Sequence, residues 1–287
     1  MSVKAYTLSF LMFLAIQTAA SGQSLDGSPY TPGKDADIDM FMGCWTESNP
    51  RVTHGTLIER DILTKGNALT PPRRGAVMEY VNRFAYGTLP AHNTTVPTAL
   101  KGQQEAFYVL SGKGTVTGGG KTADLFDGIC FFVPEGLEFT MTNTGDEPLT
   151  MYVISDPVPE GFKPGKEIRV KNENLFPLGT KDGHWCYQER DLLTGRDGLA
   201  TIYAIITLTM DPMTIGHPHS HGRGTEEIWT TIKGNNIAFL GKQIRMQPPG
   251  TAYMIPEDGK TTHSNINQSK TEQVKMLYIA VRKDLKK

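Results

Sequence analysis

The chain repeats itself, and this repeat constrains the fold more than any other feature of the sequence. The segment 105–112 reads Glu-x6-Gly and returns as 227–234, while 128–134 reads Gly-x5-Pro and returns as 250–256. Both matches share an offset of 122 residues. Self-similarity at one fixed offset is the signature of a duplicated structural unit. The sequence therefore predicts two copies of one unit.

The proline- and glycine-rich segment 156–165 marks the joint between the copies. We assign the first copy to residues 46–158 and the second to residues 165–287. Residues 23–45 are polar and rich in glycine, proline and aspartate. They are expected to form an extended N-terminal arm with little structure of its own.

Each unit reads as a series of short strands. Apolar or alternating runs such as 76–81 are separated by turn residues, and no long 3.6-residue periodicity persists. The 30 glycines and 18 prolines favour short strands and tight turns over long helices. The prediction is an all-β protein with few helices, each unit being a sandwich or small barrel.

A histidine run opens the most chemically informative stretch, Gly216 to Glu227. His217, His219 and His221 occupy alternate positions. If the run is a β-strand, all three side chains share one face. Neutral imidazoles with a carboxylate suit Zn, Fe, Mn, Ni or Cu. The alternative is a solvated, histidine-rich loop.

The second unit resembles a cupin. The family's first motif is an HxH pair followed by Glu-x6-Gly, and its second begins Gly-x5-Pro and ends His-x3-Asn. Here His219 and His221 supply the pair, and 227–234 supplies the glutamate and glycine. Segment 250–256 opens the second motif, and 263–267 closes it. The resemblance implies two tandem jelly-roll β-barrels, a bicupin.

The resemblance also implies a ligand set for one divalent transition metal: His219, His221, Glu227 and His263. Two choices stay open. Five residues separate His221 from Glu227, where the family has three or four. Glu226 would shorten that gap but break the six-residue spacing to the next glycine. His217 with His219 forms a second, less favoured HxH register.

The first unit has lost most of this set. It keeps Glu105, but Phe139 stands where the last histidine belongs. Residues 98–101 (Thr-Ala-Leu-Lys) replace the HxH region. The metal site is therefore predicted in the C-terminal barrel alone.

Four further residues are candidates for catalysis beside the metal. Arg223 is suited to holding a substrate carboxylate bidentately. Glu226 would serve as a general base if burial raised its pKa. Tyr253 and His217 are candidate pocket groups. The alternatives are a solvated loop for Glu226, Arg223 and His217, and core packing for Tyr253.

Charge and targeting signals limit the expected partners and location of the protein. Lys and Arg total 29 against 30 for Asp and Glu, which argues against nucleic acid or an anionic membrane as a partner. Residues 1–22 have the pattern of a signal peptide, so a periplasmic or secreted protein is expected. In such a compartment a Cys44–Cys186 disulfide is one possibility. Cys130 lies in an apolar run and is expected to be a buried thiol.

The function that follows is an exported, metal-dependent bicupin enzyme with a small oxygen-rich substrate, such as a sugar, a sugar acid or another carboxylate. The resemblance implies chemistry of the oxygenase, decarboxylase, isomerase or lyase type. The alternative is a non-catalytic carbohydrate-binding or storage-type bicupin with a structural metal. Assembly into a homo-oligomer is compatible with both.

Overall fold

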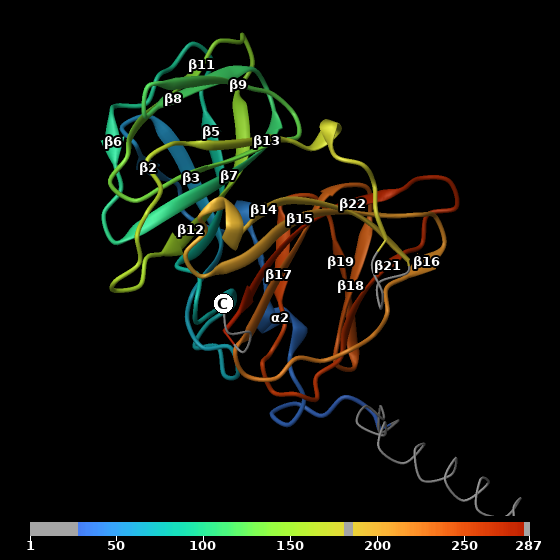
Figure 1. The fold of residues 1–287 in the computed structure, drawn as a ribbon. Coiled ribbons are helices and arrows are strands. Elements are labelled where there is room, and N and C mark those ends of the chain that lie inside the picture. Colours follow the sequence, from blue (N-terminus) through green and yellow to red (C-terminus); the bar gives the residue numbers. More distant parts are fainter. Residues whose placement is uncertain (1–27, 181–185, 284–287) are drawn as a thin grey trace, which may run out of the picture.

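The computed structural model describes residues 28–180 and 186–283. In these residues the chain forms 22 strands and one short α-helix, α2 (Ile38–Phe41). They also form three 3-10 turns: η1 (Trp45–Glu47), η2 (Glu173–Leu175) and η3 (Gly195–Asp197). The strands build two jelly-roll barrels, the first blue to green and the second orange to red in Figure 1. The predicted all-β class with two jelly-roll units is confirmed.

The first barrel combines an eight-stranded and a four-stranded sheet. The larger sheet runs, in spatial order, β13 (Arg169–Asn172), β10 (Ile129–Val133), β7 (Gln103–Ser111), β12 (Leu149–Pro157), β5 (Arg83–Leu89), β3 (Leu57–Lys65) and β2 (Arg51–Thr53), with β4 (Ala76–Met78) beside β3. The smaller sheet runs β6 (Thr98–Ala99), β11 (Glu138–Asn143), β8 (Gly114–Gly118) and β9 (Lys121–Leu125).

The second barrel combines a six-stranded and a four-stranded sheet. The larger runs β1 (Met42–Cys44), β20 (Thr251–Met254), β17 (Thr225–Lys233), β22 (Val274–Arg282), β15 (Ile202–Met210) and β14 (Tyr187–Thr194). The smaller runs β16 (Thr214–Ile215), β21 (His263–Asn267), β18 (Asn236–Leu240) and β19 (Gln243–Gln247).

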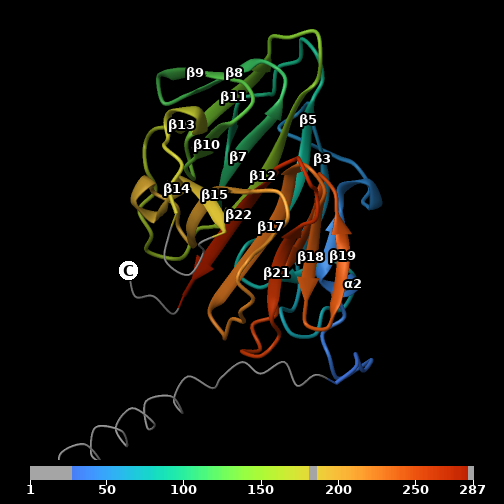
Figure 2. The same cartoon turned by 90° about the vertical axis from the view of Figure 1, so that its right-hand side faces the viewer.

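The two units exchange edge strands. β1 comes from the N-terminal arm but pairs with β20 of the second barrel. β13 follows the joint, inside the range predicted for the second unit, yet it pairs with β10 of the first barrel. The arm also carries α2, which Figure 2 shows beside β19. The arm is therefore more ordered than expected, because it completes a sheet of the second barrel.

The two barrels are filled differently. The first contains an apolar cluster in which the Phe107 and Phe131 rings stack at 4.7 Å between centroids. The second holds a buried polar network in which the Asn236 amide donates to Gln247 and Asn265 at 2.8 and 2.7 Å. A larger apolar cluster joins the two units across their large sheets. The second barrel thus has an interior that is suited to polar chemistry.

The repeated glycines have a backbone reason. Gly112 and Gly234 have φ of 95° and 89°, and Gly128 and Gly250 both have φ of 83°. L-residues with a side chain rarely adopt these angles. A Cβ on Gly112 would also lie 2.7 Å from the Cα of Leu149. The motif glycines therefore mark the same tight turn in each barrel.

The remaining sequence predictions concern the three cysteines and export. Cys44, Cys130 and Cys186 are free thiols, so the Cys44–Cys186 disulfide is absent. Cys130 is fully buried, as expected. The predicted signal peptide lies outside the described residues. Among the helices that the structure describes, none is long and apolar enough to span a membrane.

Candidate metal centre

Register places the predicted ligand Glu227 inside the second barrel. It is the third residue of β17, as Glu105 is the third residue of β7. Across the sheet, Glu227 faces Ala280 of β22. Because side chains alternate along a strand, Glu226 points to the opposite face. The structure thus distinguishes the two carboxylates that the sequence left open.

The histidine run is not the continuous strand that would align all three imidazoles. β16 ends at Ile215, and the run makes only an isolated bridge between His219 and His263. In that bridge the His263 N–H donates to the His219 carbonyl at 2.8 Å. The paired backbones bring the two rings to 4.4 Å between centroids. Two histidines far apart in sequence are therefore adjacent through backbone pairing.

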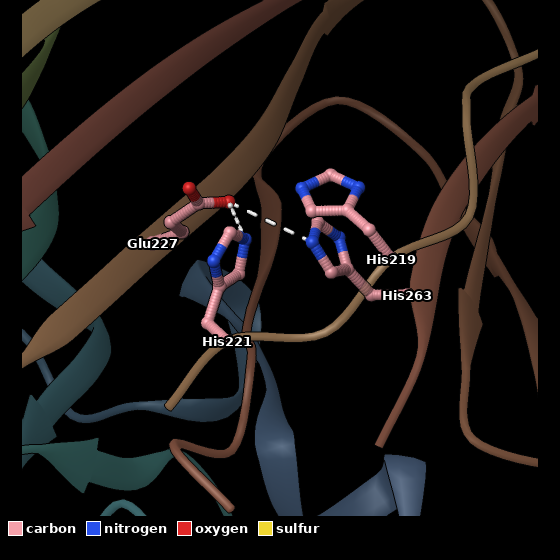
Figure 3. Close-up of side chains that lie close together, drawn as sticks. All are labelled: His219, His221, Glu227 and His263. Atoms are coloured by element: carbon pink, nitrogen blue, oxygen red, sulfur yellow. Dashed lines mark ion pairs between the residues drawn. The ribbon is translucent and has the colours of Figure 1, made fainter. Parts of the chain in front are cut away.

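The four predicted ligands converge. His219, His221, Glu227 and His263 each offer a ligand atom, and these atoms all lie within 4.8 Å of one another. The Oε2 atom of Glu227 lies 3.1 Å from His221 Nε2 and 3.7 Å from His263 Nε2 (Figure 3). Three imidazoles and one carboxylate suit a divalent transition metal. The donor set present in this chain thus fits such an ion.

The surroundings of Glu227 favour its ionised form. Burial opposes its ionisation, but the hydrogen bond and charge of His221, the charge of His263 and the Tyr278 hydroxyl outweigh burial. The pKa of Glu227 therefore lies well below its ordinary value. An ionised carboxylate is the form that binds a metal.

His217 lies outside the cluster. Its side chain is exposed, and its ring centroid is 5.9 Å from that of His219. Its carbonyl oxygen lies 2.9 Å from His219 Nδ1. That contact favours the tautomer with a proton on Nδ1, which leaves Nε2 as the ligand atom. The residue acts on the site through its backbone.

Glu226 and Arg223 lie at the contact between the barrels. Both oxygens of Glu226 accept hydrogen bonds from the backbone N–H groups of Glu79, Tyr80 and Val81, at 2.7 to 3.0 Å. Burial raises the pKa of Glu226 to about 7, although those N–H groups favour the charged form. Arg223 donates to both oxygens of Glu79, at 3.0 and 2.9 Å. This geometry clamps the metal-bearing unit to the first barrel and does not support the predicted catalytic roles.

For Tyr253 the structure agrees with the alternative prediction, which was core packing. It is fully buried, and its hydroxyl donates to the carbonyl of Ser264 at 3.1 Å. Its cross-strand partner in the β17–β20 pair is Trp229. Tyr253 is thus a core residue whose hydroxyl is satisfied by β21 of the other sheet.

In the first barrel, charged side chains rather than a ligand cluster surround the retained glutamate, Glu105. Glu105 accepts from Arg83 Nη2 at 2.5 Å and lies 3.0 Å from His54 Nε2. Phe139 packs edge-on against the His54 ring, with 5.3 Å between centroids. Arg83 also donates through Nε to the buried Glu59 at 3.1 Å. A guanidinium therefore neutralises the retained glutamate. The sequence comparison missed both Arg83 and His54, which come from segments outside the motifs.

Acid should weaken this first-barrel network. Burial opposes the ionisation of Glu59, but Arg83, Thr53 and Arg51 outweigh it, so its pKa is lowered. A lowered folded pKa gives stability that is present above the unfolded value, about 4.3, and is lost as pH falls through the folded value. We expect wild-type stability to drop below about pH 4. Urea unfolding of wild type and Glu59→Gln from pH 7 to 3 checks this. Equal slopes of stability against pH for the two proteins would contradict it.

Comparison with known proteins agrees with the two-barrel geometry. The sequence model of the Cupin domain family (Cupin_2) matches residues 86–155, within the first barrel. A search of curated protein sequences finds no significant match. The structure of Ylba from E. coli aligns with a TM-score of 0.63 at 14% identity, covering 89% of this chain and 97% of that one.

Two further structures share the fold. A mutant form of oxalate decarboxylase OxdC from Bacillus subtilis aligns with a TM-score of 0.63 at 13% identity, covering 88% of this chain and 80% of that one. Vicilin from hazelnut, Corylus avellana, aligns with a TM-score of 0.61 at 12% identity, covering 85% and 86%. At these identities the likeness speaks for the fold alone. The family match therefore identifies a cupin domain in the first barrel, and the chain as a whole has the two-barrel fold of a bicupin.

Proposed function

We propose that this protein is a metal-dependent enzyme whose single site lies in the second barrel. The observation that carries the proposal is the convergence of His219, His221, Glu227 and His263 within 4.8 Å. Oxalate decarboxylase, which shares the fold, is an enzyme acting on a small carboxylate. We propose a substrate of related chemistry, a sugar acid or another small carboxylate, and a chain that is exported.

The donor set indicates which role the protein and which role a bound ion would have. A divalent ion at this site would act as a Lewis acid on a substrate oxygen pair. The three imidazoles and Glu227 would hold it, and the ionised Glu227 would lower the net charge. Trp229 and Tyr278 pack beside the site, with 4.7 Å between their ring centroids, and both are buried.

A storage or carbohydrate-binding role with a bracing metal is the second candidate. Vicilin, which shares the fold, supports it. Exposure of the ligands favours the enzyme. His219 is only partly buried, whereas Glu227 and His263 are each 1% exposed. A purely bracing ion is enclosed by its ligands, while a catalytic one keeps an open position.

Elemental analysis tests the proposal. Purified protein is expected to carry close to one equivalent of a transition metal per chain, because one barrel alone has the ligand set among the residues that the structure describes. The loaded protein is then screened on sugar acids and small carboxylates, with and without O2. Turnover that disappears after chelation and returns with the metal supports an enzyme. A bound metal without turnover, and without exchange of water at the ion, would favour the storage alternative.

A further inference from the structure

The carboxylate of Glu227 is engaged asymmetrically. Its Oε1 atom accepts the Tyr278 hydroxyl at 2.6 Å and Arg282 Nη2 at 3.0 Å. Its Oε2 atom faces His221 and His263, and it accepts the Trp229 indole N–H at 3.3 Å. Figure 3 shows one oxygen turned to the imidazoles and the other turned away. The two oxygens therefore have different partners.

Sheet register explains the arrangement. Tyr278 and Arg282 lie on β22, two residues to either side of Ala280, which is the cross-strand partner of Glu227. Residues two apart on a strand share a face. Tyr278, Ala280 and Arg282 thus form one inward row, in which the small Ala280 leaves room for the glutamate. The alternation in the sequence of β22 was the signal that could have identified these residues.

The first barrel provides an internal comparison. There the cross-strand partner of Glu105 is Ser155, and the residues two to either side are Val153 and Pro157. Neither Val153 nor Pro157 offers a side-chain donor. Its glutamate is instead held by Arg83 and His54. In the second barrel, which carries the ligand cluster, β22 therefore presents two donors to the glutamate. In the first barrel, β12 has no donor at the two matching positions.

We infer that Tyr278 and Arg282 are positioning residues that make Glu227 a one-oxygen ligand, through Oε2. The inference rests on the proposed metal site. A carboxylate that binds through both oxygens occupies two coordination positions. Holding Oε1 limits Glu227 to one, so the protein supplies four ligand atoms. An ion that prefers six ligands would then keep two positions for a bidentate substrate such as a carboxylate or a hydroxy acid.

Cobalt substitution tests the inference. Co(II) is loaded into wild type, Tyr278→Phe, Arg282→Gln and the double variant, and its visible spectrum and dissociation constant are measured. Outer partners of metal ligands typically contribute about 10–100-fold in affinity. We expect a loss in that range for the double variant, with a changed spectrum as Glu227 becomes free to bind through both oxygens. Arg282→Lys, which keeps the charge, should lie between wild type and Arg282→Gln.

Matched controls separate positioning from general destabilisation. Tyr203→Phe and Arg196→Gln make the same chemical changes at exposed positions and should leave spectrum and affinity unchanged. Wild-type spectrum and affinity in the double variant would overturn the inference and leave the metal site standing. Failure of wild type to bind Co(II) would overturn both. Tyr278→Phe preserves the ring that packs on Trp229, so it is the variant that best keeps the fold.

Discussion

Replacing His221 and His263 together with alanine is expected to remove the metal from this protein. The two imidazoles lie 3.1 and 3.7 Å from the ligand oxygen of Glu227, and they come from a loop and from β21. Their loss leaves one histidine and one carboxylate. Affinity should fall by far more than the ~100-fold that marks the loss of an outer partner. Elemental analysis after dialysis against the metal measures it.

The matched control changes two other histidines. His92 and His217 are exposed and lie outside the cluster, so His92→Ala/His217→Ala should keep the metal. This control also tests the alternative HxH register that includes His217. Far-UV circular dichroism establishes that each variant is folded. Metal addition should raise the melting temperature of wild type and the control, but not of His221→Ala/His263→Ala, because a metal stabilises the folded state only if it binds to it. Retention of one equivalent by the latter would exclude the proposed site.

The second large effect is expected in the first barrel, which lacks the ligand cluster. Arg83 joins the buried carboxylates of Glu59 and Glu105, whose side chains are at most 1% exposed. Arg83→Met would leave both without their shared cation. Breaking a buried pair by removing one partner costs about 3–5 kcal/mol. Denaturant unfolding should show a loss of this size in the first barrel.

Two further variants make the Arg83 result specific. Arg73→Met removes an exposed arginine of the same unit and should leave stability within about 0.5 kcal/mol of wild type. Arg83→Met/Glu105→Leu also removes one of the two carboxylates that Arg83 contacts, and it should recover part of the loss. Wild-type stability for Arg83→Met would mean that the guanidinium does not replace a metal in neutralising this barrel. The metal content of the second barrel should be unchanged throughout.

Local sequence patterns predicted much of the fold. The repeat at a fixed offset predicted two units, because the same glycines are needed wherever the same positive-φ turn recurs. Gly112 and Gly234 show this directly, with φ of 95° and 89°. The spacing from Glu227 to Gly234 spans one strand, so it also fixed which face the glutamate occupies. Strand patterns of this kind are local, and they can be read without a partner strand.

Other features depended on partners that no local pattern reveals. The sequence suggested an extended arm, but pairing of β1 with β20 and of β13 with β10 draws each segment into the opposite barrel. Glu226 and Arg223 read as pocket residues because they adjoin the histidines. The structure turns Glu226 to the backbone of Glu79, since neighbours on a strand face opposite ways, and it places Arg223, in the turn before β17, on the Glu79 carboxylate.

The sequence alone determined the class of fold, the duplication and the four side chains suited to one metal, because these depend on residue type and spacing along single strands. Tertiary structure decided how those side chains are held. Backbone pairing sets His219 beside His263, and the register of β17 against β22 aims Tyr278 and Arg282 at one oxygen of Glu227. In the first barrel it supplied Arg83 to the remaining glutamate. Register between distant strands arises from the packing of the whole sheet, and the spacing of residues in one motif does not contain it.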